Sequence, residues 1–584
     1  MSKAEVAEVL KEIATLLELK GENPFKSRAY VNAARAVEAC EEPLERLVAE
    51  GRLGEVKGLG EALQEKVRRL VVEGRLEYYE ELKRSLPAGL PELLRIPGLG
   101  PKKIKLLHEE LGVVDVATLE AACRGEAIRG LAGFGEKSVA KLLAGIEQFR
   151  MYARQHRAGD VLEMAEGLVE LLRGHPAVVR VALAGSLRRG KEVIKDIDLI
   201  ASSKDPVRVM EMFVGLPGVI EVVNHGETKS SVLLEGGVPC DLRVVEDFQF
   251  PYALHHFTGS KEHNVALRQR AIGRGMKMSE WGLFRQGSGE GGELVVCRDE
   301  AELFGALGLE FVPPELRENL GEIEAAEAGR LPRLVEWTEL RGCFHNHTTA
   351  SDGRNTLEEM AEAAEALGLE YLGIADHSRS SYQAHGLSEE RLMEQVARIQ
   401  ELNGSGRFEV RLLAGVECDI LKGGELDFGD DVLAQLDYVV ASVHAGFSGS
   451  EAEMTERLVR AMRNRWVTML GHPTGRLLLQ REGYPVDLGR VIEVAAETGT
   501  WIELNASPWR LDLDWRWWRR AAEAGVRCAI NPDAHSVEQL GYLRLGVAAA
   551  RKGWLRREDV VNTLRWSELE PRLGEKRRGQ ERRA

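Results

Sequence analysis

Cysteine is scarce in this sequence of 584 residues, which has seven cysteines and no Cys-x-x-Cys pair. Because the set is scattered and odd in number, it argues against a disulfide framework and favours a reducing compartment. No apolar run reaches the ~20 residues that a membrane helix requires, and Met1–Val6 does not start the apolar core of a signal peptide. We therefore expect a cytoplasmic protein that does not associate with a membrane.

Basic residues are also fewer than acidic ones. The 93 acidic residues outnumber the 78 basic ones, and the net charge is −15. This balance argues against a uniformly basic nucleic-acid binder, but local patches, backbone amides and bound metals still allow contact with DNA. At this length, and with a hydrophobic content of 44%, the chain should hold several domains with their own cores.

One stretch with a strong chemical pattern begins with Gly185-Ser186-Leu187-Arg188-Arg189. The apolar run Val178–Ala184 before it predicts a buried strand, and Asp196 and Asp198 lie in a second strand-like run, Ile194–Ala201. Residues two apart on a strand point to the same face, so two carboxylates repel each other there unless a cation lies between them. A surface turn before a polar strand is the plain alternative.

The residues of this stretch could bind a divalent cation and a phosphate at the same time. Carboxylates and phosphate oxygens are the ligands that Mg²⁺ prefers. Ser186 and Arg189 supply donors for phosphate, which arginine can bind through two parallel hydrogen bonds. The stretch therefore predicts a site for a metal ion and a nucleoside triphosphate.

Three Gly-x-Gly segments punctuate the first part of the chain, which otherwise has helical patterns. The pairs are Gly58 and Gly60, Gly98 and Gly100, and Gly133 and Gly135. Each pair lies between two helical patterns, an arrangement typical of a helix-hairpin-helix. Glycine permits a tight turn with outward N–H groups, and the next helix N-terminus favours an anion. Such turns bind DNA phosphates without recognising bases, although any single pair is more often a plain turn.

The last part of the chain alternates strand-like runs with amphipathic helices. The runs are Tyr371–Ala375, Leu412–Val416, Tyr438–Val443, Trp466–Leu470, Trp501–Leu504 and Cys528–Ile530. This alternation predicts a parallel, barrel-like α/β fold, in which the C-terminal strand ends converge on one site.

Imidazoles and carboxylates recur at those strand ends. They are His345, His347, Asp352, Asp376, His377, Glu417, His444, His472, Asp533 and His535. Every histidine after residue 340 except His385 belongs to this set. A single histidine is usually a satisfied polar residue, but so many at successive strand ends predict a centre for Zn²⁺, Mn²⁺ or Fe²⁺.

The Gly-Ser-x-Arg-Arg stretch and its Asp-x-Asp pair resemble the palm signature of family X DNA polymerases. The resemblance covers residues 1–320 and implies a third carboxylate on a later strand, which Asp241 in Val238–Val245 matches. It implies that Asp196, Asp198 and Asp241 hold the Mg²⁺ or Mn²⁺ ions of nucleotidyl transfer. The nucleotide-binding residues it implies are Gly185, Ser186, Arg189, Phe257, Gly259 and Asn264, and Arg268 would contact the template strand. His256 stands where animal relatives have tyrosine, which leaves ribonucleotide rejection open.

The first helical block resembles the small lyase domain of the same family. By that resemblance Lys66 is the catalytic lysine that forms a Schiff base, with Lys26 and Tyr30 beside it. A partly desolvated lysine can become a nucleophile because burial lowers its pKa. A solvated lysine on a helix surface is the alternative.

The imidazole and carboxylate set resembles that of the polymerase and histidinol phosphatase (PHP) domain, which holds three metal ions. By this resemblance the first metal takes His345, His347, Glu417 and Asp533. The second takes Glu417, His444 and His472. The third takes Asp352, His377 and His535.

We therefore expect a multidomain chain with N-terminal α-helical helix-hairpin-helix domains, an α/β nucleotidyltransferase palm and thumb, and a C-terminal barrel-like PHP domain. The expected boundaries are a lyase-like DNA-binding domain at 1–85, a second helix-hairpin-helix subdomain at 86–150, a palm at 151–250, a thumb at 251–320, a linker at 321–340 and the PHP domain at 341–575.

The resemblances imply a monomeric DNA polymerase that fills short gaps in base excision repair. Its partners would be gapped or nicked duplex DNA and deoxynucleoside triphosphates. The PHP domain would supply a 3′–5′ exonuclease and an endonuclease at abasic sites. The alternatives are a PHP domain that is a small-molecule phosphatase, and one that binds metals as a structural scaffold.

Overall fold

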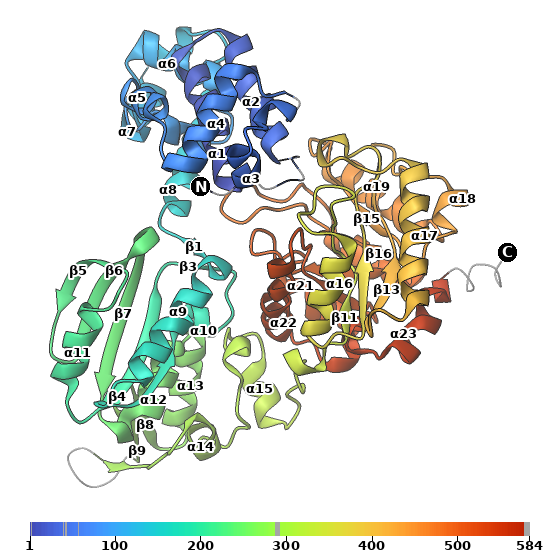
Figure 1. Cartoon of the computed structure of the whole chain (residues 1–584). Helices are drawn as coiled ribbons and strands as arrows, with labels where there is room; N and C mark the ends of the chain where they lie inside the picture. The colour runs from blue at the N-terminus through green and yellow to red at the C-terminus, as the bar shows by residue number, and fades with distance from the viewer. Residues whose placement is uncertain are drawn as a thin grey trace. The chain divides into compact units, whose positions relative to one another are not determined.

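The computed structural model describes the chain except for residues 2, 39, 41, 43, 57, 126, 286–291 and 577–584. The chain forms two compact units, Met1–Arg154 and Gln155–Ala584, whose elements are labelled in Figure 1. None of the described helices is both long and apolar enough to cross a membrane.

The first unit is built from helices around two apolar cores. Val6, Leu10, Ile13 and Leu17 are buried on one face of the first helix, as their spacing predicts. Pro24 starts the second helix, where a backbone N–H would have no partner within the helix. The helices are α1 (Lys3–Lys20), α2 (Pro24–Glu38), α3 (Leu44–Ala49), α4 (Glu61–Glu73), α5 (Glu77–Arg84), α6 (Pro101–Leu111), α7 (Val116–Arg124) and α8 (Glu136–Tyr152), with short 3₁₀ turns η1 (Leu53–Glu55), η2 (Pro91–Arg95) and η3 (Ala127–Gly130).

The predicted glycine pairs form the same turn at three places. The first glycines have left-handed backbone, with φ of 98° at Gly58, 90° at Gly98 and 87° at Gly133. The second glycines, Gly60, Gly100 and Gly135, have extended backbone and cap α4, α6 and α8. A backbone hydrogen bond closes each turn, from Leu59 to Val56, from Leu99 to Ile96 and from Phe134 to Leu131. The left-handed conformation therefore requires glycine only at the first position of each pair.

A five-stranded sheet in the order β2-β4-β7-β6-β5 opens the second unit. Its strands are β2 (Val178–Leu183), β4 (Ile197–Ser203), β5 (Val219–His225), β6 (Lys229–Leu234) and β7 (Val238–Val245). Strands β4 and β7 are parallel, and the other neighbours are antiparallel. The helices α9 (Ala158–Arg173) and α11 (Pro206–Val214) pack on the sheet, where Phe213 shares a core with Leu199 and Leu242.

Two details of this sheet differ from the sequence prediction. Strand β2 is only partly buried, because it pairs with β4 alone at the edge of the sheet. The run Ile194–Ala201 is not one strand: β3 (Val193–Ile194) pairs separately with β1 (His156–Arg157), and a bend at Lys195 precedes β4. Asp196 therefore lies just before β4.

A smaller α/β part follows the sheet. It contains α12 (Phe250–Thr258), α13 (Lys261–Gly273), α14 (Glu300–Ala306) and a three-stranded antiparallel sheet of β8 (Met276–Ser279), β9 (Gly282–Arg285) and β10 (Glu293–Leu294). The segment 321–340, expected as a linker, is packed along much of its length. Glu322 in α15 (Glu322–Glu327) is buried 2.7 Å from Nδ1 of His263, and Val335 and Leu340 belong to the core of the last part.

The last part is a parallel α/β barrel, as predicted. Its strands form two parallel sheets, β11 (Gly342–Cys343), β12 (Tyr371–Ile374) and β13 (Arg411–Ala414), then β14 (Glu417–Asp419), β15 (Val440–Ser442), β16 (Met469–Leu470), β17 (Trp501–Asn505) and β18 (Cys528–Asn531). Single parallel bridges join His377, after β12, to Glu417 and Asn346, after β11, to Ala534, which links the first sheet to both edges of the second. The short strands β11 and β14 were not predicted, and the strand expected over Leu412–Val416 ends at Ala414.

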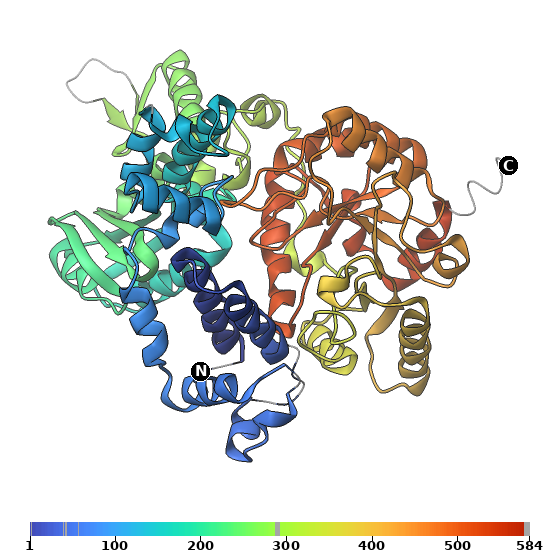
Figure 2. The ribbon, with the colours of Figure 1, turned by 90° about the horizontal axis from the view of Figure 1, so that it is seen from above.

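Helices surround these strands in the view of Figure 2. They are α16 (Leu357–Ala366), α17 (Glu389–Ser405), α18 (Asp430–Leu433), α19 (Glu451–Arg463), α20 (Leu488–Thr498), α21 (Trp515–Glu523), α22 (Leu543–Lys552) and α23 (Trp566–Leu573). Their apolar faces and the strands form the largest apolar core of the described chain. The polar strand ends are therefore held on a rigid framework.

Candidate active sites

Two adjacent parallel strands bring the predicted carboxylates of the first site together. Asp198 on β4 lies in register with Asp241 on β7, and Asp196 precedes β4. Burial raises the pKa of Asp198 to about 6, and the charges of Asp196 and Asp241 add to this effect. Burial and the charge of Asp241 likewise raise the pKa of Asp196. A divalent cation would relieve this repulsion, so the residues fit a metal ion.

The glycine of the Gly-Ser turn is required by these carboxylates. Gly185 has φ of 61°, and a Cβ added to it would lie 2.0 Å from Oδ2 of Asp198. The turn continues as a short helix, α10 (Gly185–Arg188), which includes Ser186. Lys229 lies 3.0 Å from Oδ2 of Asp241 and partly balances the acidic cluster.

Arg189 is held in place by several partners. Its Nε atom donates to Oε1 of Glu318 at 3.1 Å, and Nη1 donates to the carbonyl oxygen of Thr258. The neighbouring Arg188 is fixed separately by Thr258 and by Glu300 at 2.5 Å. The two arginines therefore join the glycine turn to the end of α12.

The other residues expected at the nucleotide lie at the junction of α12 and α13. Phe257 and Gly259 end α12, and the Asn264 amide donates to the carbonyl of His256 at 2.7 Å. An added Cβ at Gly259 would lie 3.1 Å from Nη1 of Arg189, so this glycine approaches the arginine directly. Arg268 is exposed one turn further along α13.

Lys66 on α4 lies in an aromatic pocket of the first unit. Its Nζ atom donates to the Tyr30 hydroxyl, and it lies 3.8 Å from the centre of the Tyr78 ring. Burial lowers the pKa of Lys66, and the charge of Lys26 lowers it further. This lysine is therefore half-buried and shifted toward its neutral, nucleophilic form.

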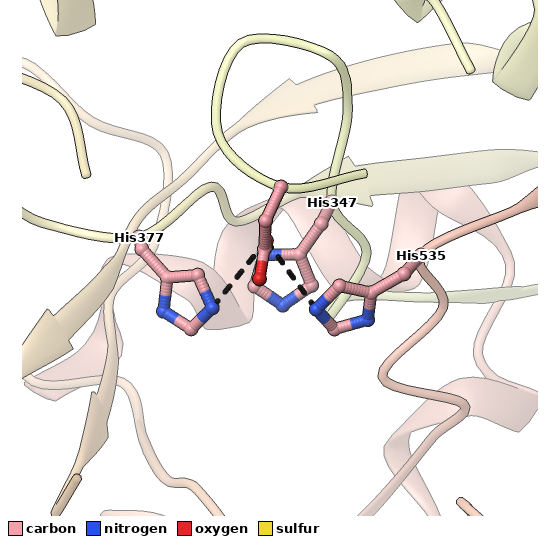
Figure 3. Close-up of side chains that lie close together, drawn as sticks. His347, His377 and His535 are labelled. Atoms are coloured by element: carbon pink, nitrogen blue, oxygen red, sulfur yellow. Dashed lines mark ion pairs between the residues drawn. The ribbon is translucent and has the colours of Figure 1, made fainter. Parts of the chain in front are cut away.

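The predicted ligands of the second site converge at the strand ends of the barrel. Ligand atoms within 4.8 Å of one another form three groups in the described chain: His347, Asp352, His377 and His535; His345, His347 and Asp533; and His377, Glu417 and His444. Figure 3 shows the imidazoles of His347, His377 and His535 pointing toward one another. His472 joins through Nε2, 2.9 Å from Oε1 of Glu417. His385 belongs to none of the groups found among the described residues.

Glu417 is the centre of this cluster. Its carboxylate lies 3.1 Å from His444, 3.3 Å from His345 and 2.9 Å from Nδ1 of His377. Burial acts to raise the pKa of Glu417, but the imidazoles of His444, His345 and His377 hold it well below its usual range. Nε2 of His377 also lies 3.6 Å from Asp352. His377 therefore belongs to two of the ligand groups, the one with Asp352 and the one with Glu417.

Several imidazole nitrogens of the cluster lack a hydrogen bond, and this bears on whether the cluster can bind metal ions. His345 Nε2, His347 Nδ1, His377 Nδ1 and His472 Nδ1 are buried and make no hydrogen bond of good geometry, although the first three face the carboxylates of Glu417 or Asp352 at 3.3, 3.9 and 2.9 Å. Buried polar atoms without partners are rare in proteins, and imidazole with carboxylate is a donor set that suits Zn²⁺, Mn²⁺ and Fe²⁺. The residues therefore fit a divalent metal centre.

Comparison with known proteins agrees with this geometry. Family models match a helix-hairpin-helix domain over residues 1–76, a SAM-like helix-hairpin-helix tandem over 90–148, a DNA polymerase beta thumb over 253–318 and a PHP domain over 344–507. The DNA polymerase/3′-5′ exonuclease PolX of Bacillus subtilis is 40% identical over 573 residues, which cover 98% of this chain and 99% of that protein.

The chain belongs to the family X DNA polymerases that carry a PHP domain. A probable phosphatase of Caldanaerobacter subterraneus subsp. tengcongensis is also similar, at 30% identity, over 38% of this chain and 85% of its own length. A probable phosphatase of Thermoanaerobacter sp. is 28% identical over the same share of the chain.

This family X polymerase also holds carboxylates that the sequence reasoning missed. Glu503 is fully buried, accepts from Nδ1 of His345 at 2.7 Å and accepts from the backbone N–H of His472 at 2.7 Å. Asp419 lies 2.9 Å from Nδ1 of His444. The available signal for Asp419 was its position two residues after Glu417 on β14, whereas Glu503 lies on β17, which carries no predicted ligand.

Asp376 was part of the predicted set but serves a different partner. It accepts hydrogen bonds from the backbone and hydroxyl of Thr348 and from the hydroxyl of Ser351. Gln395 donates to it as well. Asp376 therefore holds the loop after His347 and is absent from the metal-suited groups of the described chain.

Proposed function

We propose that this chain fills short gaps in duplex DNA and trims DNA ends with its PHP domain. The observation that carries the first activity is the register of Asp198 with Asp241, beside the Gly185 turn. The substrates would be deoxynucleoside triphosphates and gapped or nicked duplex DNA. We place the protein in the cytoplasm as a monomer active in base excision repair.

The polymerase residues would act by position and charge. Divalent Mg²⁺ or Mn²⁺ held at the carboxylates would supply charge neutralisation and activation of the primer 3′-hydroxyl. Asp196 and Asp198 would each hold both ions, and Asp241 would hold the one at the primer. Ser186 and Arg189 would bind the triphosphate, while Phe257, Gly259 and Asn264 would face the nucleotide. The exposed Arg268 would contact the template strand.

The paired glycines would hold the duplex through its backbone. Gly60, Gly100 and Gly135 place helix N-termini with open space in front of them. A phosphate can approach such N–H groups closely because no side chain intervenes. This contact carries no sequence preference, as a gap-filling enzyme requires.

The PHP centre would cleave phosphodiester bonds in a 3′–5′ exonuclease and an abasic-site endonuclease. Three divalent ions (Zn²⁺, Mn²⁺ or Fe²⁺) would be held there, and they would supply a hydroxide nucleophile by lowering the pKa of bound water. The first would use His345, His347, Glu417 and Asp533. The second would use Glu417, His444 and His472, and the third Asp352, His377 and His535. The name of the Bacillus subtilis relative includes a 3′-5′ exonuclease.

Phosphatase activity is a second candidate for the PHP part, because the two similar phosphatases match that share of the chain. One experiment compares the three interpretations. In separate reactions the metal-loaded protein is given a one-nucleotide-gapped duplex with deoxynucleoside triphosphates, a single-stranded oligonucleotide, or p-nitrophenyl phosphate. We expect gap filling and oligonucleotide degradation. Hydrolysis of the small phosphate alone would favour a phosphatase, and metal binding without any hydrolysis would favour a scaffold.

Lyase activity at Lys66 is a further proposal for the first unit. The neutral amine that burial favours there could attack the aldehyde of an abasic sugar and form a Schiff base. The Tyr30 hydroxyl, which accepts from Lys66, would orient the amine.

A further inference from the structure

A lysine of the PHP part reaches the turn that we expect to bind the triphosphate. Lys552, at the end of α22, is fully buried. Its Nζ atom donates to the carbonyl oxygen of Arg189 at 2.9 Å, to that of Glu315 at 3.2 Å and to Oε1 of Glu318 at 2.7 Å. Lys552 therefore holds the backbone of Arg189 and the carboxylate that holds its side chain.

Three cations share the Glu318 carboxylate. Lys552 lies 2.7 Å away, while Arg189 and Lys191 each lie 3.1 Å away. Burial acts to raise the pKa of Glu318, but these cations outweigh it and hold that pKa at about 2. Burial lowers the pKa of Lys552 to about 8, which leaves it mostly protonated at pH 7. One negative charge among three positive ones leaves an excess of positive charge beside the turn.

The excess of positive charge should make it easier for Arg189 to bind the triphosphate. If Glu318 faced only Arg189, the pair would be neutral and the arginine would have to leave its partner to bind phosphate. Because Lys552 competes for the same carboxylate oxygen, the positive charge of Arg189 is less fully compensated. An incoming anion can then be bound with less rearrangement.

Residues of the PHP part also contact Glu192, at the other end of the segment that begins with Arg189. Trp515 on α21 donates from Nε1 to Oε2 of Glu192 at 3.1 Å, and Arg476 lies 3.6 Å from Oε1 of that carboxylate. The Trp515 ring also lies under Lys552 and Lys191, with ring-centre distances of 4.5 and 4.9 Å. The segment Arg189–Glu192 is therefore fixed at both ends by PHP residues.

We propose that Lys552 is a positioning residue for nucleotide addition, which acts through Glu318 and the Arg189 carbonyl to place the triphosphate-binding arginine. The PHP part would then contribute to polymerisation as well as to nuclease chemistry. This inference rests on the proposed role of Arg189 in binding the triphosphate. It makes the affinity for the nucleotide, rather than the rate of the chemical step, the property that depends on Lys552.

The test is steady-state gap filling on a one-nucleotide-gapped duplex with the full chain carrying Lys552→Met. Methionine removes the charge and keeps the length of the side chain. We expect KM for the nucleotide to rise about tenfold, as loss of a hydrogen bond to a charged group predicts, with kcat changed less than about twofold. Exonuclease rate on a single-stranded oligonucleotide should stay at the level of the unmodified protein.

Lys576→Met is the matched control, because Lys576 is a partly buried lysine near the end of the described chain whose amine is also fully hydrogen-bonded. Its Nζ donates to the carbonyls of Met462 and Val467 and to the Thr500 hydroxyl. Both variants remove an amine that donates to three acceptors, so both should lower the melting temperature, but only Lys552→Met should change KM. Equal KM effects in the two variants would overturn the proposal and leave general destabilisation as the cause.

Trp515→Phe keeps the proposal testable if Lys552→Met does not fold, and a double variant tests it further if Lys552→Met does fold. Trp515→Phe deletes the Nε1 donor to Glu192 and should raise KM about threefold, near the lower end of a hydrogen-bond effect. Glu318→Gln combined with Lys552→Met should give less than the sum of the two single effects, because both act on Arg189. Additive effects, or an unchanged KM in folded variants, would contradict the positioning role. Absence of gap filling in the unmodified protein would instead contradict the proposed function.

Discussion

Nδ1 of His345 lies 2.7 Å from Oε1 of Glu503, and both side chains are fully buried. Burial acts to raise the pKa of Glu503, but the charge of His345 outweighs it and keeps the carboxylate ionised. With Nδ1–H donating to Glu503, the Nε2 atom of His345 is the one left to a metal ion. Glu503 therefore orients a predicted ligand without belonging to the ligand set.

We predict that Glu503→Gln lowers metal affinity and exonuclease rate by about 10- to 100-fold, the usual effect of losing a carboxylate behind a ligand histidine. Metal titration followed by calorimetry, and cleavage of a labelled oligonucleotide, measure the two quantities. Glu493→Gln is the control, since Glu493 is exposed on α20 and pairs with Arg490. Equal metal affinity in both variants would show that Glu503 is only a packing residue.

Replacing Glu417 should reduce metal binding and nuclease rate more than replacing Glu503 does. Its carboxylate contacts the imidazoles of His345, His377, His444 and His472. Glu417→Gln keeps the size of the side chain and removes its charge, and an amide is a poor bridge between cations. We expect lower metal content and severe loss of exonuclease and abasic-site cleavage, with gap filling retained. Elemental analysis and cleavage rates in added Mn²⁺ check this, with His385→Ala as the control that should keep both. A Glu417→Gln variant that cleaves normally would refute the metal assignment.

Asp198→Asn should have the opposite effect to Glu417→Gln, with loss of gap filling and retention of the exonuclease. The register of Asp198 with Asp241 predicts that both hold the metal ions of nucleotide addition. We expect gap filling to fall by about a thousandfold, equivalent to several kcal/mol of lost charge stabilisation. The exonuclease should be unaffected, because its proposed metal ligands lie at the strand ends of the barrel. Primer extension and primer degradation on one gapped duplex measure both, and loss of both in a folded variant would disprove separate sites.

The sequence allowed the sites to be predicted where the signal is local or repeated. The glycine pairs recur with the same spacing, and the barrel ligands follow successive parallel strands, which converge by the rules of the fold. Asp198 and Asp241 were paired through family resemblance. These predictions needed no knowledge of side-chain packing.

Contacts between distant segments could not be predicted in this way. Arg189 and Lys552 are 363 positions apart, and a lysine at the end of an amphipathic helix usually faces solvent. Glu503 looked like an ordinary residue of a buried strand. The sequence pattern also did not reveal which glycine of each pair needs left-handed backbone.

That distinction between the glycines gives a prediction for DNA binding. Gly100 and Gly135 have ordinary backbone, and a Cβ added to either meets nothing within 4 Å. The double variant Gly100→Val and Gly135→Val should therefore lose only the modest stability of two helix N-caps but bind duplex DNA about tenfold more weakly, because valine blocks the approach of phosphate. Gly98→Val should instead destabilise the first unit, since Gly98 has φ of 90°. Fluorescence anisotropy at two salt concentrations gives the affinities, with Gly167→Val on α9 as the control. Unchanged affinity in the double variant would make these turns structural only.

The last prediction concerns Lys66. A Schiff base requires a neutral amine, and burial together with the charge of Lys26 lowers the pKa of Lys66 below its ordinary value of 10.5. At a given pH below that value, a larger fraction of Lys66 than of an exposed lysine is therefore neutral. We expect borohydride to trap the protein on DNA with an abasic sugar phosphate, and trapping should reach its plateau at a lower pH than an ordinary lysine would allow.

Lys66→Met should abolish this cross-link, while Lys83→Met is the matched control. Lys83 also lies over a tyrosine ring, 4.0 Å from the centre of Tyr79, but it is more exposed and pairs with Glu12 at 3.7 Å. The two variants remove the same charge and the same kind of ring contact from one unit. If both variants cross-link like the unmodified protein, another amine carries the reaction; if neither the variants nor the unmodified protein cross-link, the first unit binds DNA without lyase chemistry.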